Sequence, residues 1–291
     1  ENSHLEFKSS FKTDTEHGGK IPTNKIIHNI IKTIGGFCNT GGGDLLIGVS
    51  DDNQIIGIEI EFFWHSSINL KSSEKKLIES AILFGFDQAK IVDIKKTKNQ
   101  NIELLNFLEK NYHGEMSWMA DRTEIRSDPK NIWNEAKSIL VLASNYHFHE
   151  NSLSLLEKKD KGIISVYARG RDYHLTIKKR LKSLSRWIVE NYKCNIKYFV
   201  DTAPVMEKPL AMKAGIGWQG KHTNIVSKEY GSWLFLSSIF LDITLESNDE
   251  MIDHCGSCQR CIDICPTDAI ERPYHINASK CISYLTIEHK S

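Results

Sequence analysis

Four cysteines lie within eleven positions near the end of the chain, in the stretch CGSCQRCIDICPTDAI (255–270). Cys255, Cys258, Cys261 and Cys265 follow the spacing C-x2-C-x2-C-x3-C, and a proline comes next. Cysteines this close along the chain do not easily pair as disulfides, whereas their thiolates can converge on a metal centre. At this spacing three sulfurs bind one 4Fe-4S cube and the fourth ligates a different cluster. Zinc is the alternative, although zinc usually takes two separated pairs. The run therefore predicts iron–sulfur chemistry.

A fifth thiol, Cys281, follows Cys265 by 16 residues and is a further candidate ligand. Two cubane clusters need more thiolates than the five that this stretch supplies. The missing ligands would lie beyond Ser291, so we expect the chain to be a fragment or a truncated gene product. Cys38 and Cys194 stand apart from the run, and we expect each to be a small buried side chain.

Charge and hydropathy restrict the partners and the compartment. Lys+Arg and Asp+Glu are balanced at 37 each, so any contact with nucleic acid needs a local basic face. A basic run within 178–186 is one candidate, and a solvated helix face explains it equally simply. No apolar run approaches the roughly 20 residues that span a bilayer, and charged residues interrupt the first twenty positions. We therefore expect a cytoplasmic protein without a membrane partner, with reduced thiols.

The elements that must position these residues alternate between helices and strands. Apolar periodicity and apolar runs predict helices at 21–36, 72–84, 104–116 and 173–192, a hairpin at 44–58, and strands at 90–94, 138–147, about 195–200 and 232–242. This alternation predicts an α/β or α+β domain over 72–245.

Two polar constellations fall inside that domain. In VDTAPVMEKPLAMKAGIGWQGKHTN (200–224), Asp201 follows a predicted strand, and three glycines predict a flexible loop that could approach a ligand. YARGRDYH (167–174) places two arginines, an aspartate, a tyrosine and a histidine ahead of a predicted helix. Each also has a structural explanation, because Asp201 could cap a turn and Gly217 could end a helix.

Residues 72–290 resemble the epoxyqueuosine reductase family. The segments HGEMSWM, RSDP, AKSILVLASNYH, ISVYARGRDYH, EYGSWLFL and KCISYLTIE, together with 200–221 and the cysteine run, stand in the order typical of that family. The resemblance implies reduction of epoxyqueuosine to queuosine at the wobble position of tRNA. It also implies cobalamin as the reactive cofactor, with two 4Fe-4S clusters that pass electrons to it from an unidentified donor.

The resemblance also assigns residues. It implies that Asp201 is the catalytic proton donor, and that three cysteines, Cys255, Cys258 and Cys261, ligate the first cluster while Cys265 and Cys281 ligate the second. Implied cobalamin contacts are Arg126, Ser165, Asp201, His222, Ile225, Leu236 and Ser283. His222 departs from the family, which commonly has asparagine there. An imidazole still donates a hydrogen bond, but its titration would make binding depend on pH.

The first 66 residues lie outside that resemblance. HLEFKSSFKTD, followed by IIKTIGGFCNTGGGDLLIGVSDDNQIIGI, resembles the start of a Schlafen-type AlbA_2 domain, a nucleic-acid-binding module. Such a part-domain is either an appendage without function or an aid to tRNA binding. The expected architecture is then a partial AlbA_2-like α/β segment (1–66), an α+β domain with an α/β-type cobalamin site (72–245) and a ferredoxin-like module for two 4Fe-4S clusters (246–291).

Two other functions fit parts of the sequence. The first is a non-catalytic electron-transfer or nucleic-acid-binding protein that keeps the cysteine run. The second is a cobalamin-dependent reductive dehalogenase, although such enzymes are typically exported behind a twin-arginine signal, which is not visible here. Asp201 and the segment GRDYH favour the reductase, since an electron carrier has no use for a proton donor beside a cofactor.

Overall fold

The computed structural model describes residues 7–8, 46–47, 72–97, 101–147 and 152–289. The chain divides into two compact units, Glu1–Ser67 and Ile68–Ser291. In the first unit, strand β1 (Phe7–Lys8) pairs in parallel with β2 (Leu46–Ile47). The predicted helix at 21–36, most of the predicted hairpin at 44–58 and the rest of the AlbA_2-like segment lie outside the described residues, so these predictions stay untested.

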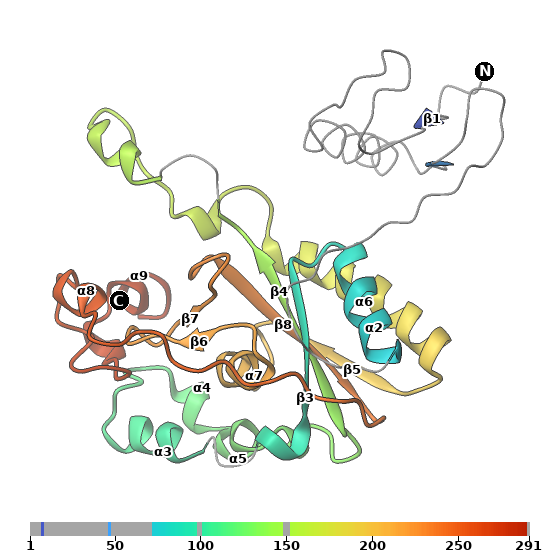
Figure 1. Ribbon diagram of the computed structural model, residues 1–291. Coiled ribbons are helices and arrows are strands. Elements are labelled where there is room, and N and C mark those ends of the chain that lie inside the picture. The colour runs from blue at the N-terminus through green and yellow to red at the C-terminus, as the bar shows by residue number, and fades with distance from the viewer. Residues whose placement is uncertain (1–6, 9–45, 48–71, 98–100, 148–151, 290–291) are drawn as a thin grey trace. The chain divides into compact units, whose positions relative to one another are not determined.

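The second unit is built on a four-stranded antiparallel sheet (Figure 1). Its strands are β3 (Gln88–Asp93), β4 (Ser138–Asn145), β5 (Ile196–Phe199) and β8 (Leu234–Leu241), in the order β3-β4-β8-β5. All three pairings are antiparallel, which makes the domain α+β. The four strands confirm the strands predicted from apolar runs.

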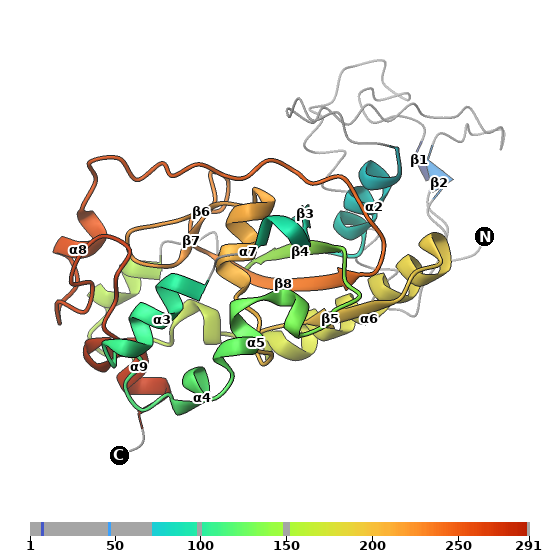
Figure 2. The same cartoon turned by 90° about the horizontal axis from the view of Figure 1, so that it is seen from below.

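One face of the sheet is covered by α2 (Ser72–Leu83) and α6 (Tyr173–Tyr192), as Figures 1 and 2 show. Buried leucines and isoleucines of both helices pack on every second residue of the strands, including Ile91 and Leu140. Both helices confirm the predicted ranges. Leu175 of α6 is nevertheless 69% exposed, because it is two positions from buried Ile177 and so lies on the opposite side of the helix.

The opposite face is covered by α7 (Glu207–Ala214). The intervening residues of the same strands, such as Val92 and Val141, pack with α7 and with Ile225. A short hairpin of β6 (Trp218–Gln219) and β7 (Ile225–Val226) follows α7. The sheet is therefore buried on both faces, with alternate side chains pointing into two separate cores.

The three glycines at 215–220 do not lie in one continuous loop, because this stretch contains the end of α7 and strand β6. Gly215 ends α7 in the left-handed region, with φ of 86°, so it is Gly215 and not Gly217 that terminates a helix. At Gly217 a Cβ would lie 2.4 Å from the Val226 carbonyl oxygen. That glycine thus permits close packing of the hairpin strands rather than movement.

Short helices connect these elements. They are η1 (Ile94–Thr97), α3 (Asn101–Glu109), α4 (Ser117–Ala120), α5 (Thr123–Ser127), η2 (Pro129–Asn131), η3 (Ser152–Glu157) and η4 (Val166–Ala168). The helix predicted at 104–116 is α3, which begins earlier and ends at Glu109. The chain then turns through Asn111 and Gly114, both at positive φ, which ends the helical repeat.

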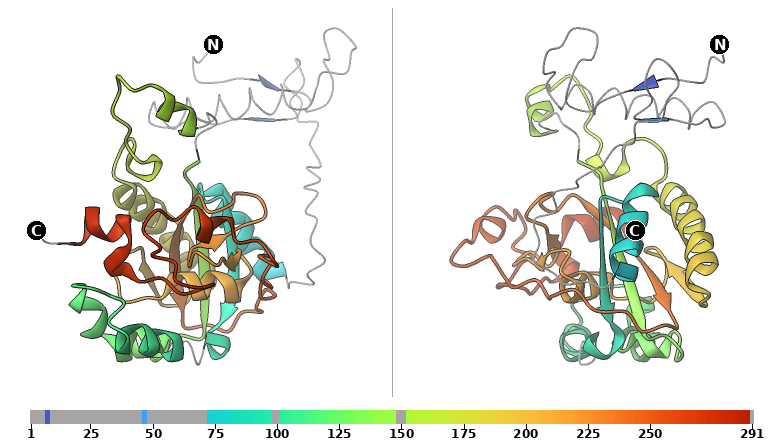
Figure 3. Two further views of the ribbon diagram at one scale, coloured as in Figure 1. Left: turned by 90° about the vertical axis from the view of Figure 1, so that its left-hand side faces the viewer. Right: turned by 45° about the vertical axis from the view of Figure 1, so that its right-hand side comes forward.

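The C-terminal segment is largely irregular and contains α8 (Arg260–Asp263), η5 (Ala278–Lys280) and α9 (Ile282–Ile287). It is the red segment of Figures 1 and 3, and it lies beside the loop that follows α3. There the Ala278 amide donates to the Tyr112 carbonyl (2.8 Å), and the Tyr284 hydroxyl accepts from the Glu115 amide (2.8 Å). Among the described residues, no helix combines the length and apolar character needed to cross a bilayer.

Candidate active site

Asp201 lies just after β5 and is held from three directions. The Tyr173 hydroxyl donates to its Oδ2 at 2.6 Å, and His174 Nε2 lies 2.8 Å from the same oxygen. Its backbone N–H donates to Oε1 of Glu207 at 2.9 Å. The residue has a φ of 54°, which is uncommon for a non-glycine residue, and these contacts hold it in that conformation.

Tyr173 and His174 come from the start of α6. Asp172 is the N-cap of this helix and accepts a hydrogen bond from the His174 amide (2.8 Å), which fixes the first turn. Because β5 runs back beside α6, its end meets the start of that helix. The two constellations noted in the sequence, Asp201 and the segment 167–174, therefore form one site.

The His174 ring bridges two carboxylates. Its Nδ1 lies 2.8 Å from Asp172 Oδ1, and its Nε2 faces Asp201. Burial alone would lower the pKa of His174, but the hydrogen bonds to Asp172 and Asp201 outweigh it, and the net pKa is raised. The hydrogen bonds from His174 lower the pKa of Asp172. A proton can therefore reside on His174, or on Asp201 with Nε2 as the acceptor.

Glu207 and Arg126 form the layer beneath Asp201. Burial raises the pKa of Glu207 to about 7, so near neutral pH this carboxyl is divided between its two forms. Burial, and then the charge of Arg122, lower the pKa of Arg126, whose guanidinium lies 4.9 Å from the Trp118 ring centroid. Arg126 Nε is buried and has no hydrogen-bond partner among the described residues, so a donor is available to a bound group.

The β6–β7 hairpin carries two of the other predicted cobalamin contacts. His222 Nδ1 accepts from the Asn224 amide (3.0 Å), and burial lowers the pKa of His222. Ile225 is buried in the second core, and Leu236 of β8 packs against that core. Arg126, Asp201 and His222 would offer hydrogen bonds to the peripheral amides of a corrin and Leu236 an apolar contact, whereas Ile225 is buried in the core. These assignments stay predictions.

Ser165 and Ser283 are not joined to that group. Ser165 precedes η4 and Ser283 lies in α9, and both are exposed. Within the described part of the chain, neither side chain hydrogen-bonds to another predicted cobalamin contact. Their assignment stays a prediction.

The cysteine run lies in the loop around α8 and is anchored by Lys221. This lysine is 7% exposed, and its Nζ donates to the carbonyls of Gly256 (2.7 Å) and Cys258 (2.9 Å). Trp218 Nε1 donates to Cys255 Sγ at 3.4 Å. The hairpin that follows α7 thus holds the cysteine loop next to the domain that contains Asp201.

Cys265, the last thiol of the run, and Cys281 lie on the C-terminal side of this loop. Cys265 Sγ accepts from the Ala269 amide (3.3 Å), and backbone hydrogen bonds from Thr267 and Ile270 lower its pKa. Such amide donors favour thiolate, the form that binds iron. Cys281 precedes α9. By contrast Cys194 is buried in the first core, which confirms the prediction made for it; Cys38 lies outside the described residues.

The thiols supply the donor types and the spacing of an iron–sulfur site. Among the described residues, no three Cys, His, Asp or Glu side chains are placed to hold a single metal ion. A cubane takes each thiolate at a different iron, so its ligands stand farther apart than those of one ion.

Two residues at this site were not anticipated from the sequence. Glu207 stands six positions after Asp201, and Lys221 lies in the segment GKH. A charged residue gives no sequence signal of burial, so neither could be distinguished from a surface residue. The approach of Lys221 to the cysteine loop, more than thirty residues away, depends on tertiary structure.

Comparisons with known proteins agree with this geometry. Residues 126–202 match the family model described as epoxyqueuosine reductase QueG, DUF1730, and residues 254–291 match a 4Fe-4S double cluster binding domain. The latter match supports the iron–sulfur interpretation of the cysteine run. These two matches leave residues 1–66 uncovered, so the AlbA_2-like segment stays a prediction.

Individual relatives are similar along most of the second unit. An epoxyqueuosine reductase from Cyclobacterium marinum is 42% identical over 214 residues, covering 73% of this chain and 68% of the relative. The epoxyqueuosine reductase of Escherichia coli is 39% identical over 223 residues, which cover 76% of this chain and 59% of that protein. A crystal structure of epoxyqueuosine reductase with an epoxyqueuosine-modified tRNA-Tyr stem loop superposes with a TM-score of 0.64 and 29% identity, covering 74% of this chain and 57% of that one. The chain therefore belongs to the epoxyqueuosine reductase family.

Proposed function

We propose that this chain catalyses the reaction for which its family is named, the reduction of epoxyqueuosine to queuosine in tRNA. The observation that carries the proposal is the placement of Asp201, whose carboxylate contacts Tyr173 and His174 at the end of β5. The solved relative with a modified tRNA stem loop supports the substrate. The partners are then the anticodon stem-loop of tRNA and an electron donor.

The reaction needs a proton at the oxygen that leaves. Both C–O bonds of the epoxide break, two electrons enter the new carbon–carbon double bond, and the oxygen departs as water with two protons. An epoxide oxygen is a poor leaving group unless it is protonated as the bond breaks. Asp201 donates that proton, and His174 restores it to Asp201 through the 2.8 Å contact at Oδ2.

The surrounding residues keep this transfer in place. Tyr173 and His174 both contact Asp201 Oδ2, and among the described residues no hydrogen bond reaches Oδ1, which would be the oxygen that serves the substrate. Glu207 holds the Asp201 amide, so the carboxyl group stays at the end of β5. Asp172 stabilises the protonated form of His174. This chain of hydrogen bonds gives each group a distinct part in holding or moving the proton.

Cobalamin and two clusters are the cofactors of the proposal. Cobalamin, when bound, supplies a cobalt centre that passes electrons to the epoxide. The residues that would hold it are Arg126, Asp201, His222, Ile225 and Leu236, with Ser165 and Ser283 as outer contacts. Cys255, Cys258 and Cys261 would ligate the first cluster, and Cys265 and Cys281 the second.

The proposed organisation assigns each step to one part of the chain. Residues 72–245 form the cobalamin-binding reductase domain and residues 246–291 the iron–sulfur module. Trp218 and Lys221 contact the cysteine loop from the reductase side, so the electron path would cross there. Residues 1–66 would form a separate segment, either without function or in contact with RNA.

The test is conversion of RNA by anaerobically reconstituted and reduced protein. An anticodon stem-loop containing epoxyqueuosine should lose one oxygen, measured by mass spectrometry. Asp201→Asn should bind cobalamin but turn over at least about a hundredfold more slowly, the usual size of general-acid catalysis. Asp160→Asn, an exposed carboxylate, is the matched control and should keep full activity.

Two outcomes would contradict the proposal. Normal turnover in Asp201→Asn removes Asp201 from the mechanism. Loading of iron and cobalamin without any conversion of the RNA favours the electron-transfer alternative.

A further inference from the structure

A pocket of about 370 Å³ lies next to the Asp201 site. It is formed by the end of β4, the turn after η4, the start of α6 and Phe235 of β8, and no Asp or Glu lines it. Its volume lies in the range of small-ligand pockets. Tyr173 belongs to both places, because it lines this pocket while its hydroxyl donates to Asp201.

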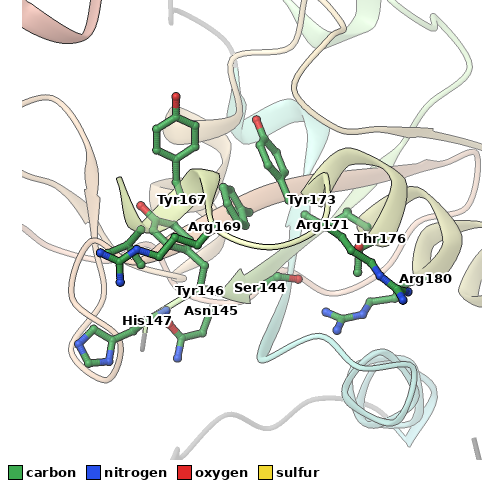
Figure 4. A pocket seen from close by; sticks show the side chains of 13 residues that line it. Ser144, Asn145, Tyr146, His147, Tyr167, Arg169, Arg171, Tyr173, Thr176 and Arg180 are labelled. Carbon is green, nitrogen blue, oxygen red and sulfur yellow. Dashed lines mark hydrogen bonds between the residues drawn. The ribbon is translucent and has the colours of Figure 1, made fainter. Parts of the chain in front are cut away.

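The pocket is cationic. Arg169, Arg171 and Arg180 line it, and Figure 4 shows Arg171 and Arg180 on one side with Arg169 on the other. Neither Arg171 nor Arg180 forms an ion pair with a described carboxylate. Adjacent guanidinium groups without carboxylate partners favour binding of an anion, and their planar donors match the geometry of phosphate.

Aromatic rings form the rest of the wall. Tyr173 stacks on Phe235 with centroids 3.9 Å apart and planes 5° apart, and Phe235 also contacts Tyr146 at 4.3 Å. Tyr167 is different, because it is 39% exposed and has no ring partner among the described residues. In Figure 4 its ring stands beside that of Tyr173 and points to the same side. A flat heteroaromatic base could therefore stack on Tyr167.

A second group of cations lies on α6, on another side of the helix from the pocket. Lys178, Lys182 and Arg186 are exposed and four positions apart, so they lie on one face of the helix. That face is turned away from Thr176 and Arg180, which line the pocket. The charge of the pocket therefore comes from its own arginines.

We propose that this pocket binds one nucleotide of the RNA that neighbours the modified nucleotide. Arg171 and Arg180 hold the phosphate, and Tyr167 stacks on the base. Because Tyr173 is shared, a nucleotide seated here would place its neighbour at Asp201. This inference rests on the proposed function, since it names how that substrate is held.

The test measures RNA affinity separately from turnover. Binding of an unmodified anticodon stem-loop to cofactor-loaded protein is followed by fluorescence anisotropy at several salt concentrations. Arg171→Gln/Arg180→Gln should weaken binding about tenfold or more and reduce the salt slope by about one per lost phosphate contact. Tyr167→Ala should weaken binding between about fivefold and a hundredfold without changing that slope, and Tyr167→Phe should restore it.

A charge-matched control uses Lys95→Gln/Lys96→Gln. These exposed lysines follow Asp93, which pairs with the start of β4, whereas the pocket lies at the other end of that strand. The control should bind RNA with nearly the original affinity. Circular dichroism of each variant verifies that it is folded.

The outcomes separate this inference from the proposed function. In one outcome, the unsubstituted protein converts the RNA while Arg171→Gln/Arg180→Gln keeps its RNA affinity and salt slope. That result would overturn the nucleotide-binding role of the pocket and leave the proposed function intact. If the double variant loses affinity for cobalamin and not for RNA, the pocket binds the nucleotide portion of that cofactor. That result would also overturn the proposed RNA-binding role of the pocket. Absence of RNA binding by the unsubstituted protein would contradict both proposals.

Discussion

The four-stranded sheet and the cysteine segment of the second unit differ in what stabilises them. The sheet buries two layers of large apolar side chains, one on each face. Among the described residues after 245, by contrast, the buried apolar side chains are Ala269, Ala278 and Tyr284. Burial of apolar area is the dominant stabilising contribution in folded domains. The sheet can therefore form its proton-donating site without a ligand.

Polar contacts anchor the cysteine segment to the sheet domain. Lys221 holds two carbonyls of the cysteine loop, and Tyr112 hydrogen-bonds to Glu271. These contacts position the cysteine segment beside the sheet domain. The Asp201 region is therefore held by a packed sheet, whereas the cysteine segment depends on a few polar contacts and, when loaded, on its cluster.

Removal of cluster ligands should give the largest effect. Cys258→Ser/Cys261→Ser should lose the iron of the first cluster and all turnover, because thiolate is the iron ligand. Hydrogen exchange in 255–281 should rise, while exchange in β4 and β8 should not change. Cys194→Ser, which alters a core cysteine, should keep its iron. If the double variant keeps its iron, the run is not the cluster site.

Lys221→Met tests the link between the two regions. Loss of two charge-assisted hydrogen bonds should open the cysteine loop, at a cost of roughly 3 kcal/mol, or about a hundredfold in local exchange. Lys213→Met is the control, since its pair with Glu250 also joins α7 to this segment but is exposed. Equal exchange rates in both variants would show that Lys221 does not anchor the loop.

Asp172→Asn tests the acid–base half. Asparagine still caps α6, but the charge that raises the pKa of His174 is gone. The pKa of His174, followed by NMR, should fall. As pH rises, turnover of the variant should then decline at a lower pH than turnover of the original protein. Relative to the original protein, the variant should be about tenfold slower near pH 8 and little slower at pH 5. An unchanged pH profile would separate His174 from proton delivery.

Glu207→Gln should have the smallest effect on turnover. Its main effect is on the stability of the fold. The pKa of Glu207 is raised from 4.5 to about 7, so its stabilising contribution is present below pH 4.5 and is lost as pH rises through 7. Glutamine stays neutral and can still accept from the Asp201 amide. The variant should be more stable by roughly 3 kcal/mol at pH 8, since one pKa unit is worth about 1.4 kcal/mol, and equally stable at about pH 4. Denaturant unfolding measures this, with exposed Glu190→Gln as a control that shows no such pH dependence.

Local structure could be predicted from the sequence where burial follows a simple period. The apolar spacing within 173–192 predicted α6, and continuous apolar runs predicted β4 and β8. α7 was missed because EKPLAMKA is short, contains proline in its first turn and adjoins three glycines. Its helical form depends on packing against the sheet rather than on its own propensity.

The site was predicted residue by residue but not as an assembly. Asp201 and the segment 167–174 each carried a signal, yet nothing in a single sequence joins the end of β5 to the start of α6. The hydrogen bond from the Asp201 amide to Glu207 and the anchoring of the cysteine loop by Lys221 likewise arise from tertiary contacts. Motif spacing predicts which atoms can do chemistry, and the fold decides which of them meet.

The central claim is that the cysteine segment passes electrons to a cobalamin held beside Asp201. The most direct measurement is an EPR and optical spectrum of anaerobically reconstituted protein, with iron and cobalamin quantified in the same sample and reductant added stepwise. We expect the signal of a reduced 4Fe-4S cluster together with bound cobalamin whose cobalt changes oxidation state. Folded protein that binds iron but no cobalamin, or cobalamin that stays unreduced while the cluster is reduced, would contradict the account.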